Sequence, residues 1–206
     1  MKLPCSILAG VVLGGAASIV NAQDQPPIAQ KAAEEKAVNL CSSCHGPRGV
    51  STSPEFPILA AQREGYTIRQ LEAFAKKKRA DKDAHDFMWG IASQLDAATI
   101  DGIARYYAMQ PPASGRPEPP ALASKGKEVF EGGAIDRGVP ACAACHGQNA
   151  EGLGEFPRLA GQHAKYITKQ FGYIQTQARE TVIRHDFINH LTPEETRAVA
   201  AYVQSR

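Results

Sequence analysis

A duplicated six-residue sequence constrains the fold of this 206-residue chain more than any other feature. The letters CSSCHG at residues 41–46 return as CAACHG at residues 142–147, 101 positions later. The motif FPILAAQ at residues 56–62 likewise returns as FPRLAGQ at residues 156–162, 100 positions later. Towards the end of the two copies the offset falls to 96, so the second copy lacks four residues there. Because self-similarity of this kind marks repeated structural units, the sequence predicts two equivalent domains.

Two further segments set the predicted boundaries. Residues 1–22 join a positive start to a stretch of apolar and small residues. This layout is typical of a secretory signal peptide, here cleaved after about Ala22, with an uncleaved anchor as the alternative. Residues 110–120 are rich in proline, which predicts a stiff extended connector. The predicted domains are therefore residues 23–109 and 121–206.

Composition excludes several classes of protein. Hydrophobic residues make up 43% and charged residues 21%, which argues against a disordered tail, a fibre or a polytopic membrane protein. The formal net charge of +2, from 23 basic and 21 acidic residues, gives no reason to expect nucleic acid as a partner. Each predicted domain has only about 85 residues, which is small for an unaided hydrophobic core, so a large bound cofactor would add the missing apolar mass.

The pattern of apolar residues predicts an all-α fold with the same order of helices in both halves. Asp96 is expected to cap one helix, and Thr192 is expected to cap another, with Pro193 at its first position and Glu195 at its third. No stretch shows the alternation expected of a half-buried strand. The predicted helices span residues 29–40, 66–78, 96–109, 125–130, 166–177 and 193–204.

The paired cysteines carry the predicted chemistry, because C-x-x-C-H is the attachment signature of c-type haem. Two cysteines on one helical turn reach both vinyl groups of one porphyrin edge, and the next histidine places a nitrogen on the iron. A disulfide, a redox dithiol or a zinc site fits less well, since zinc needs four converging ligands and a dithiol leaves the histidines unexplained. The sequence therefore predicts two covalently bound haem c groups, one on Cys41, Cys44 and His45 and one on Cys142, Cys145 and His146.

The iron of an electron-carrying haem needs a sixth ligand. In the first half Met88 is the expected ligand, because it lies between two predicted helices and follows the cysteine pair by a whole helix. His85, three residues earlier, is the competing ligand. Met109 falls at the end of a predicted helix and is expected to be a packing or surface residue.

The motifs resemble those of the two-haem class I cytochromes c of the c4 type, over nearly all of the chain after residue 22. The resemblance rests on both copies of the two repeated motifs, on the spacing Met88-x-x-x-Ala92-x-x-Leu95 and on the proline-rich connector. It implies two tandem all-helical haem domains about a pseudo-twofold axis, with haem edges near their interface. It also implies electron transfer in the bacterial periplasm, often towards a terminal oxidase.

The same resemblance implies a contact on the far side of each ligating histidine. The backbone carbonyls of Pro57 and Pro157 are expected to face the second ring nitrogens of His45 and His146. A hydrogen bond of this kind orients an imidazole and raises its basicity.

The chain departs from the family at the second haem, because no methionine follows Met109. Counting back from the final helix places His185 beside the position equivalent to Met88, so we expect His185 to ligate the second iron. His185 also belongs to a tripeptide that recurs from His85 onward, which allows a shared structural role instead. His190, present only in the second half, is the alternative ligand, and an open site is the third possibility.

These features predict a periplasmic carrier that passes single electrons between redox protein partners. A dehydrogenase or another respiratory protein would be the donor and a terminal oxidase an acceptor, and such partners could bring the protein to the membrane. A haem enzyme or gas-binding protein, with the second haem as its reactive centre, is the alternative, and a subunit of a dehydrogenase is a third reading. Residues 76–79 are expected to be a solvated helix end, and His163 an exposed residue.

Overall fold

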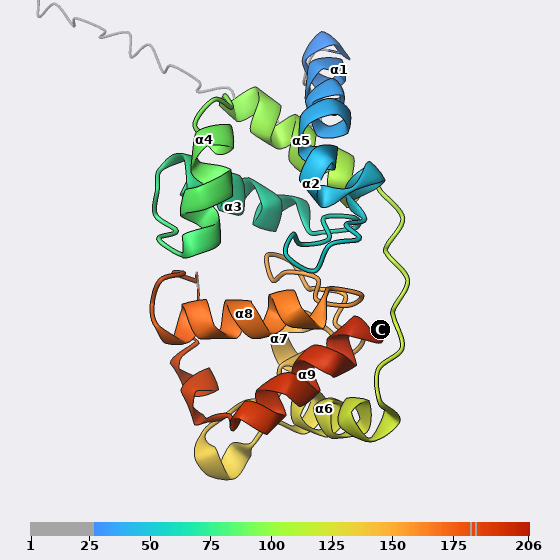
Figure 1. Ribbon diagram of the computed structural model, residues 1–206, viewed down its shortest axis with the longest axis vertical. Coiled ribbons are helices and arrows are strands. Elements are labelled where there is room, and N and C mark those ends of the chain that lie inside the picture. The colour runs from blue at the N-terminus through green and yellow to red at the C-terminus, as the bar shows by residue number, and fades with distance from the viewer. Residues whose placement is uncertain (1–26, 182, 184) are drawn as a thin grey trace, which may run out of the picture.

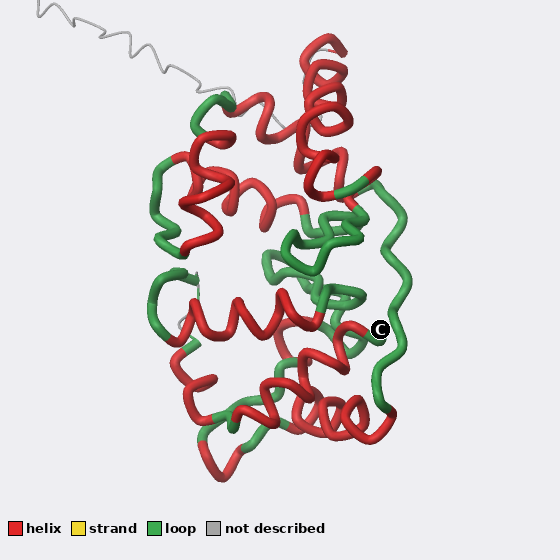
Figure 2. The backbone as a smooth tube through the Cα atoms, in the orientation of Figure 1, coloured by secondary structure: helices red, strands yellow, loops and turns green. Residues whose placement is uncertain are grey.

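The computed structural model describes residues 27–181, 183 and 185–206, so the predicted signal peptide and its cleavage after about Ala22 lie outside the described residues. The described residues form two helical halves stacked along the long axis of the molecule (Figure 1). No strand occurs among them, and a single isolated bridge joins Ala134 and Val139 (Figure 2). The predicted all-α fold is confirmed.

The order of helices repeats between the halves. Helix α1 packs against α5 in the first half as α6 packs against α9 in the second, and α3 packs against α5 as α8 packs against α9. In the first half, π-helical turns at Ala37–Cys41 and Ala84–Met88 lead into α2 and α4. The first half contains α1 (Pro27–Lys36), α2 (Ser42–His45), α3 (Glu64–Ala75), α4 (Trp89–Ala92) and α5 (Ala97–Ala108). The second half contains α6 (Pro120–Gly132), α7 (Ala143–His146), α8 (Ala164–Gln175) and α9 (Pro193–Gln204).

The last helix of each half begins as the sequence predicts. The Asp96 carboxylate accepts the Thr99 backbone N–H at 2.8 Å. The Thr192 hydroxyl accepts the Glu195 N–H at 3.2 Å, and the Glu195 carboxylate accepts the Thr192 N–H at 2.8 Å. Both arrangements satisfy backbone donors that a helix start otherwise leaves unpaired. The pattern did not predict the helical stretch of residues 84–92, and α6 begins earlier than expected.

One glycine in each half permits the close crossing of its terminal helices. A Cβ atom on Gly102 of α5 would lie 2.3 Å from the Cβ atom of Ala33 in α1. A Cβ atom on Gly126 of α6 would lie 1.9 Å from the carbonyl oxygen of Ala198 in α9. Since both distances are far inside van der Waals contact, the two crossings depend on these glycines.

Each half has its own hydrophobic core. The core of the first half includes Leu71, Ile103 and Tyr107, and the core of the second includes Phe130 and Tyr202. The Phe130 and Tyr202 rings lie 5.3 Å apart, between centroids. The apolar faces of the helices therefore turn inward within each half, which leaves the surface between the halves free to be polar.

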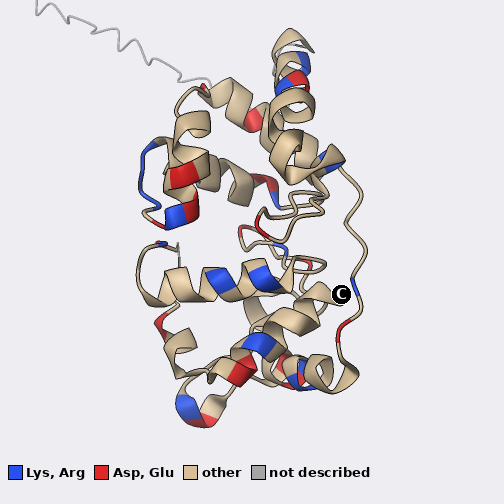
Figure 3. Ribbon diagram, viewed as in Figure 1, with Lys and Arg blue, Asp and Glu red and all other residues tan. Residues whose placement is uncertain are grey.

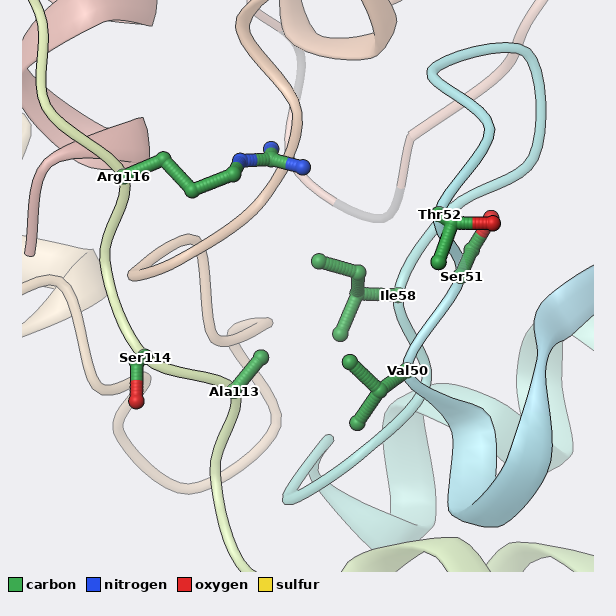
Figure 4. A pocket seen from close by; sticks show the side chains of 7 residues that line it. All are labelled: Val50, Ser51, Thr52, Ile58, Ala113, Ser114 and Arg116. Carbon is green, nitrogen blue, oxygen red and sulfur yellow. The ribbon is translucent and has the colours of Figure 1, made fainter.

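Residues 110–119 run in extended form along one side of the molecule and join the halves (Figure 1). The Arg116 backbone N–H donates to the Gln204 carbonyl oxygen at 2.9 Å, which fixes this connector to the second half. A cavity of about 420 Å³ separates the connector from a first-half loop, and the Val50 and Ile58 side chains face the connector across it (Figure 4). The cavity is lined by Val50, Ser51, Thr52, Ile58, Ala113, Ser114 and Arg116.

In the view of Figure 3 both signs of charge occur on both halves, and the basic run of residues 76–79 lies along the loop after α3. In the part of the chain that the structure describes, no helix combines the length and the apolar character needed to cross a bilayer.

Candidate haem sites

In the first half, the cysteine pair lies at a junction of two helical segments. Cys41 ends a π-helical turn, and Cys44 and His45 follow on α2. Gly46 then adopts a φ of +75°, which ends the helix and turns the chain away. The Nδ1–H of the buried His45 ring donates to the Pro57 carbonyl oxygen at 2.9 Å, so Nε2 is the nitrogen available to a metal ion.

The second half repeats this geometry. Cys145 and His146 lie on α7, directly after Cys142, and Gly147 has a φ of +82°. The Nδ1–H of His146 donates to the Pro157 carbonyl oxygen, also at 2.9 Å. The contacts expected for Pro57 and Pro157 are therefore confirmed in both halves.

Burial sets the protonation of the groups in both sites. Desolvation lowers the pKa of His45 and of His146, which favours the neutral imidazole that can ligate a metal. Desolvation raises the pKa of Cys41, and it raises the pKa of Cys142 to about 11, so both thiols are uncharged near neutral pH. Because a thioether is uncharged as well, attachment of haem at these positions buries no ionised sulfur.

Two of the alternatives to haem, a disulfide and a zinc site, find no geometric support. All four cysteines described are free, so neither pair forms a disulfide. Across residues 27–181, 183 and 185–206, no group of three or more His, Cys, Asp or Glu side chains is placed to hold a metal ion.

Met88 packs against the first-half core. It is half-buried at the end of its π-helical turn, and it packs against the same core cluster as Cys41. His85, the competing residue, is exposed and points elsewhere: its Nδ1 contacts the Asp86 carboxylate at 2.9 Å, and its ring stacks edge-on against Trp89.

His185 and His190 occupy different environments in the second half. His185 is half-buried, its Nδ1–H donates to the Ile183 carbonyl oxygen at 2.6 Å, and its charge contributes to lowering the pKa of His146. His190 is exposed, and its Nδ1–H donates to the Arg137 carbonyl oxygen at 2.7 Å. Of these two candidates, only His185 contributes to the lowered pKa of His146.

The buried charged and polar groups between the two halves are compatible with bound haem. Arg79, Asp81 and Arg179 are all buried there, and Arg79 Nε donates to the Asp81 carboxylate at 2.9 Å. Two buried donors, Arg179 Nε and Gln170 Nε2, have no acceptor among the described residues. Two guanidinium groups and unpaired donors beside one carboxylate suit a ligand that carries carboxylates of its own, as haem does through its propionates.

Two expectations about single residues are wrong. His163 is 2% exposed rather than on the surface, and its Nε2–H donates to the Ser51 carbonyl oxygen of the other half at 3.1 Å. Arg79 ends a run of exposed lysines, yet it is buried between the halves. Both residues are covered by the opposite half, so no signal within their own local sequence distinguishes them from surface residues.

Comparison with known proteins agrees with these sites. The family model described as cytochrome c matches residues 123–206. Cytochrome c4 of Stutzerimonas stutzeri is 34% identical, over 81% of this chain and 84% of that protein. The thiosulfate dehydrogenase electron acceptor of Thiomonas intermedia is 34% identical, over 87% of this chain and 84% of that protein. The solved structure of Acidithiobacillus ferrooxidans cytochrome c4 has a TM-score of 0.76 and 36% identity, over 81% of this chain and 98% of that chain. The chain therefore belongs to the c4-type cytochromes c, a family of electron carriers with covalently bound haem c rather than enzymes.

Proposed function

We propose that this chain carries two covalent haem c groups and passes single electrons through them. The predicted domains, residues 23–109 and 121–206, would each hold one haem. The ligands of the first haem would be Cys41, Cys44, His45 and Met88, and those of the second Cys142, Cys145, His146 and His185.

The strongest support for this proposal is the hydrogen bond made by the histidine after each cysteine pair. Both halves present a histidine directly after a cysteine pair, buried in the first half and half-buried in the second, and in each a proline carbonyl accepts its Nδ1–H at 2.9 Å. This bond fixes the tautomer that leaves Nε2 for the metal, and it increases the basicity of the ring. The same device occurring twice is the expected outcome if each half binds its own haem.

The chain's own residues would orient and insulate the two centres. Bound haem supplies an iron that changes its charge by one electron. His45 and His146 remain neutral because burial lowers the pKa of each, so near neutral pH no proton competes with the metal for Nε2. The buried guanidinium groups of Arg79 and Arg179 would pair with haem carboxylates between the halves. No proton transfer or substrate site is needed for this activity.

The donor that we propose is a periplasmic dehydrogenase. A relative with 34% identity is named as the electron acceptor of thiosulfate dehydrogenase, and a solved thiosulfate dehydrogenase has 28% identity over 88% of this chain and 40% of its own length. A terminal oxidase is the proposed acceptor. Both partners require export, as the signal peptide predicted in residues 1–22 would provide, and contact with the membrane would come through them.

Mass spectrometry after acid–acetone extraction tests the cofactor content. We expect the purified protein to retain two haem masses, because thioether bonds survive extraction that removes non-covalent haem. Reduction of the protein by a thiosulfate dehydrogenase, followed in a stopped-flow spectrometer, then tests the donor. Release of both haems into the solvent would overturn the proposal.

Carbon monoxide separates the carrier from a gas-binding protein. If Met88 and His185 complete the two iron sites, reduced protein should bind carbon monoxide slowly or not at all at neutral pH. Rapid, stoichiometric binding at the second haem would instead show an open site there, contrary to ligation by His185.

A further inference from the structure

The two repeated F-P-x-L-A-x-Q motifs each end in a glutamine that reaches into the opposite half. Gln62 and Gln162 are 7% and 6% exposed, respectively, and lie where the loops of the two halves meet. Their side-chain amides bind the backbone of the other motif, at Arg158 and Ile58 respectively. The exchange is reciprocal, as the internal repeat would require of an interface about a pseudo-twofold axis.

Gln162 binds the backbone of Ile58 at two points. The Ile58 N–H donates to Gln162 Oε1 at 2.9 Å, and Gln162 Nε2 donates to the Ile58 carbonyl oxygen at 3.0 Å. The His163 N–H also donates to Gln162 Oε1, at 3.1 Å. Because backbone N–H groups can only donate, these two contacts fix which end of the amide is the oxygen.

Gln62 does the same in the opposite direction. The Arg158 N–H donates to Gln62 Oε1 at 2.8 Å, and Gln62 Nε2 donates to the Arg158 carbonyl oxygen at 3.0 Å. The Arg63 N–H donates to the same Oε1 at 2.9 Å. The two glutamines therefore have the same partners, position for position.

The bonded N–H groups belong to the peptides that hold the ligating histidines. The Ile58 N–H and the Pro57 carbonyl are the two ends of one peptide group, and that carbonyl accepts Nδ1–H of His45. A continuous chain of two hydrogen bonds, both 2.9 Å long, thus runs from Gln162 through this peptide to His45. The Pro157–Arg158 peptide connects Gln62 to His146 in the same way.

A peptide group that donates through its N–H becomes a better acceptor at its carbonyl, because hydrogen bonds in series polarise one another, most strongly where water is excluded. A stronger acceptor at Nδ1–H makes the imidazole more basic and stabilises the higher oxidation state of a metal on Nε2. The direction of the effect is therefore defined: the glutamine lowers the reduction potential of the haem to which it is connected.

We infer that Gln162 and Gln62 are positioning residues for the haem ligand of the opposite half: Gln162 tunes the haem on His45, and Gln62 tunes the haem on His146. This inference rests on the proposed function, since it requires iron on both histidines. It makes each potential a property of the interface, because neither half contains the whole hydrogen-bond chain to its own histidine.

Redox titration of the two-haem protein with Gln162→Leu tests the inference. We expect the equilibrium constant for reducing the first haem to rise about threefold. This corresponds to a rise of roughly 30 mV in its reduction potential, at 59 mV per tenfold change. The reduction potential of the second haem should stay unchanged. Gln62→Leu should raise the reduction potential of the second haem and leave that of the first haem unchanged. The near-infrared sulfur-to-iron band of the ferric Met88 site assigns each step, since only the first haem has a methionine ligand.

His163→Leu is the matched control. It removes the hydrogen bond between the halves that joins His163 Nε2 to the Ser51 carbonyl oxygen. This hydrogen bond does not involve the Pro57–Ile58 peptide. We expect this change to leave the first potential within the error of wild type. An equal rise in His163→Leu and Gln162→Leu would overturn the inference, because general loosening of the interface would then explain both.

A second variant and a second readout keep the test decisive if Gln162→Leu folds poorly. Gln162→Glu retains an oxygen for the Ile58 N–H, so the first haem should titrate at or below its wild-type potential. In ¹H–¹⁵N NMR spectra of reduced protein, the His45 Nδ1–H signal should stay downfield in Gln162→Glu and move upfield in Gln162→Leu. A raised first potential in Gln162→Glu, or a shift confined to the haem of the mutated half, would contradict the inference. Absence of two covalent haems from the wild-type protein would instead contradict the proposed function.

Discussion

In the first half, the chain approaches its last helix through a π-helical turn and α4, whereas the equivalent stretch of the second half is a single 3₁₀ segment, Asp186–His190. On the other side of the predicted haem sites the halves are nearly identical. His45 and His146 each bond a proline carbonyl at 2.9 Å and each lie near the phenylalanine of the repeated motif, although His45 is buried and His146 is half-buried.

This contrast shows which part of each site is free to change. The side with the ligating histidine is tied to the other half through the glutamine bonds, so a change there would disturb two sites at once. The opposite side has no such glutamine bonds among the described residues, and it is tied to the other half by an ion pair from Asp83, directly before the π-helical turn, to Lys169 at 2.6 Å. The second copy is four residues shorter there, about one helical turn, and it has lost the methionine while retaining His185.

Removal of the proposed sixth ligands should give the largest spectroscopic difference between the two halves. Met88→Ala is expected to abolish the near-infrared sulfur-to-iron band and leave the second haem low-spin, because that band requires a methionine ligand. His185→Ala is expected to convert the second haem to a high-spin form that binds carbon monoxide, with the band intact. Absorption and electron paramagnetic resonance spectra of both variants measure these changes.

His190→Ala is the control for His185→Ala. His190 is exposed and its Nδ1–H is engaged by the Arg137 carbonyl oxygen, so its removal should leave both haems low-spin. If His190→Ala frees the second haem and His185→Ala does not, then His190 is the ligand and the similarity of the second site to the first is weaker than we propose.

The reduction potentials should differ between the halves in the wild-type protein. Methionine with histidine raises the potential of a haem relative to other ligand sets, so the haem on His45 and Met88 should be the higher-potential centre. In a spectroelectrochemical titration, the near-infrared band should disappear in the first reductive step. Loss of the band in the second step, or two indistinguishable steps, would contradict this order.

The smallest expected difference between the halves is in how far acid destabilises the start of the last helix in each half, α5 and α9. Hydrogen bonds from Arg137 and from the Thr192 N–H lower the pKa of Glu195 from 4.5 to about 2. Because the pKa is lower in the folded state, the stabilisation by Glu195 is complete above about pH 4.5 and is lost as the pH falls towards 2. The aligned residue of the first half is Thr99, which cannot titrate in this range.

Urea unfolding at about pH 6 and about pH 3 measures this contribution. Glu195→Gln should reduce the loss of unfolding free energy between the two pH values, since the variant has no carboxylate to protonate there. Asp96→Asn is the matched variant in the first half. There, hydrogen bonds from Thr99 are the main cause of the lowered pKa of Asp96. An equal or larger effect of Asp96→Asn would show that the guanidinium of Arg137 adds nothing to the second half.

Most of the helical fold could be predicted from the sequence, because its signals are local. Helix caps such as Asp96 and Thr192 act within one turn, and each C-x-x-C-H sequence places its own three groups on one turn. The repeat then relates one half to the other without any knowledge of contacts. The helical stretch of residues 84–92 was missed because its first turn is π-helical and therefore departs from the 3.6-residue period.

The interface could not be predicted in this way, because its contacts join residues about 100 positions apart. Gln62 and Gln162 are recognisable as motif residues in the sequence, but a sequence motif does not state which backbone its amide will bind. Arg79 and His163 read as surface residues since the groups that bury them belong to the opposite half. Free energy of burial depends on what covers a side chain, and for these residues the cover arises only when the two halves pack together.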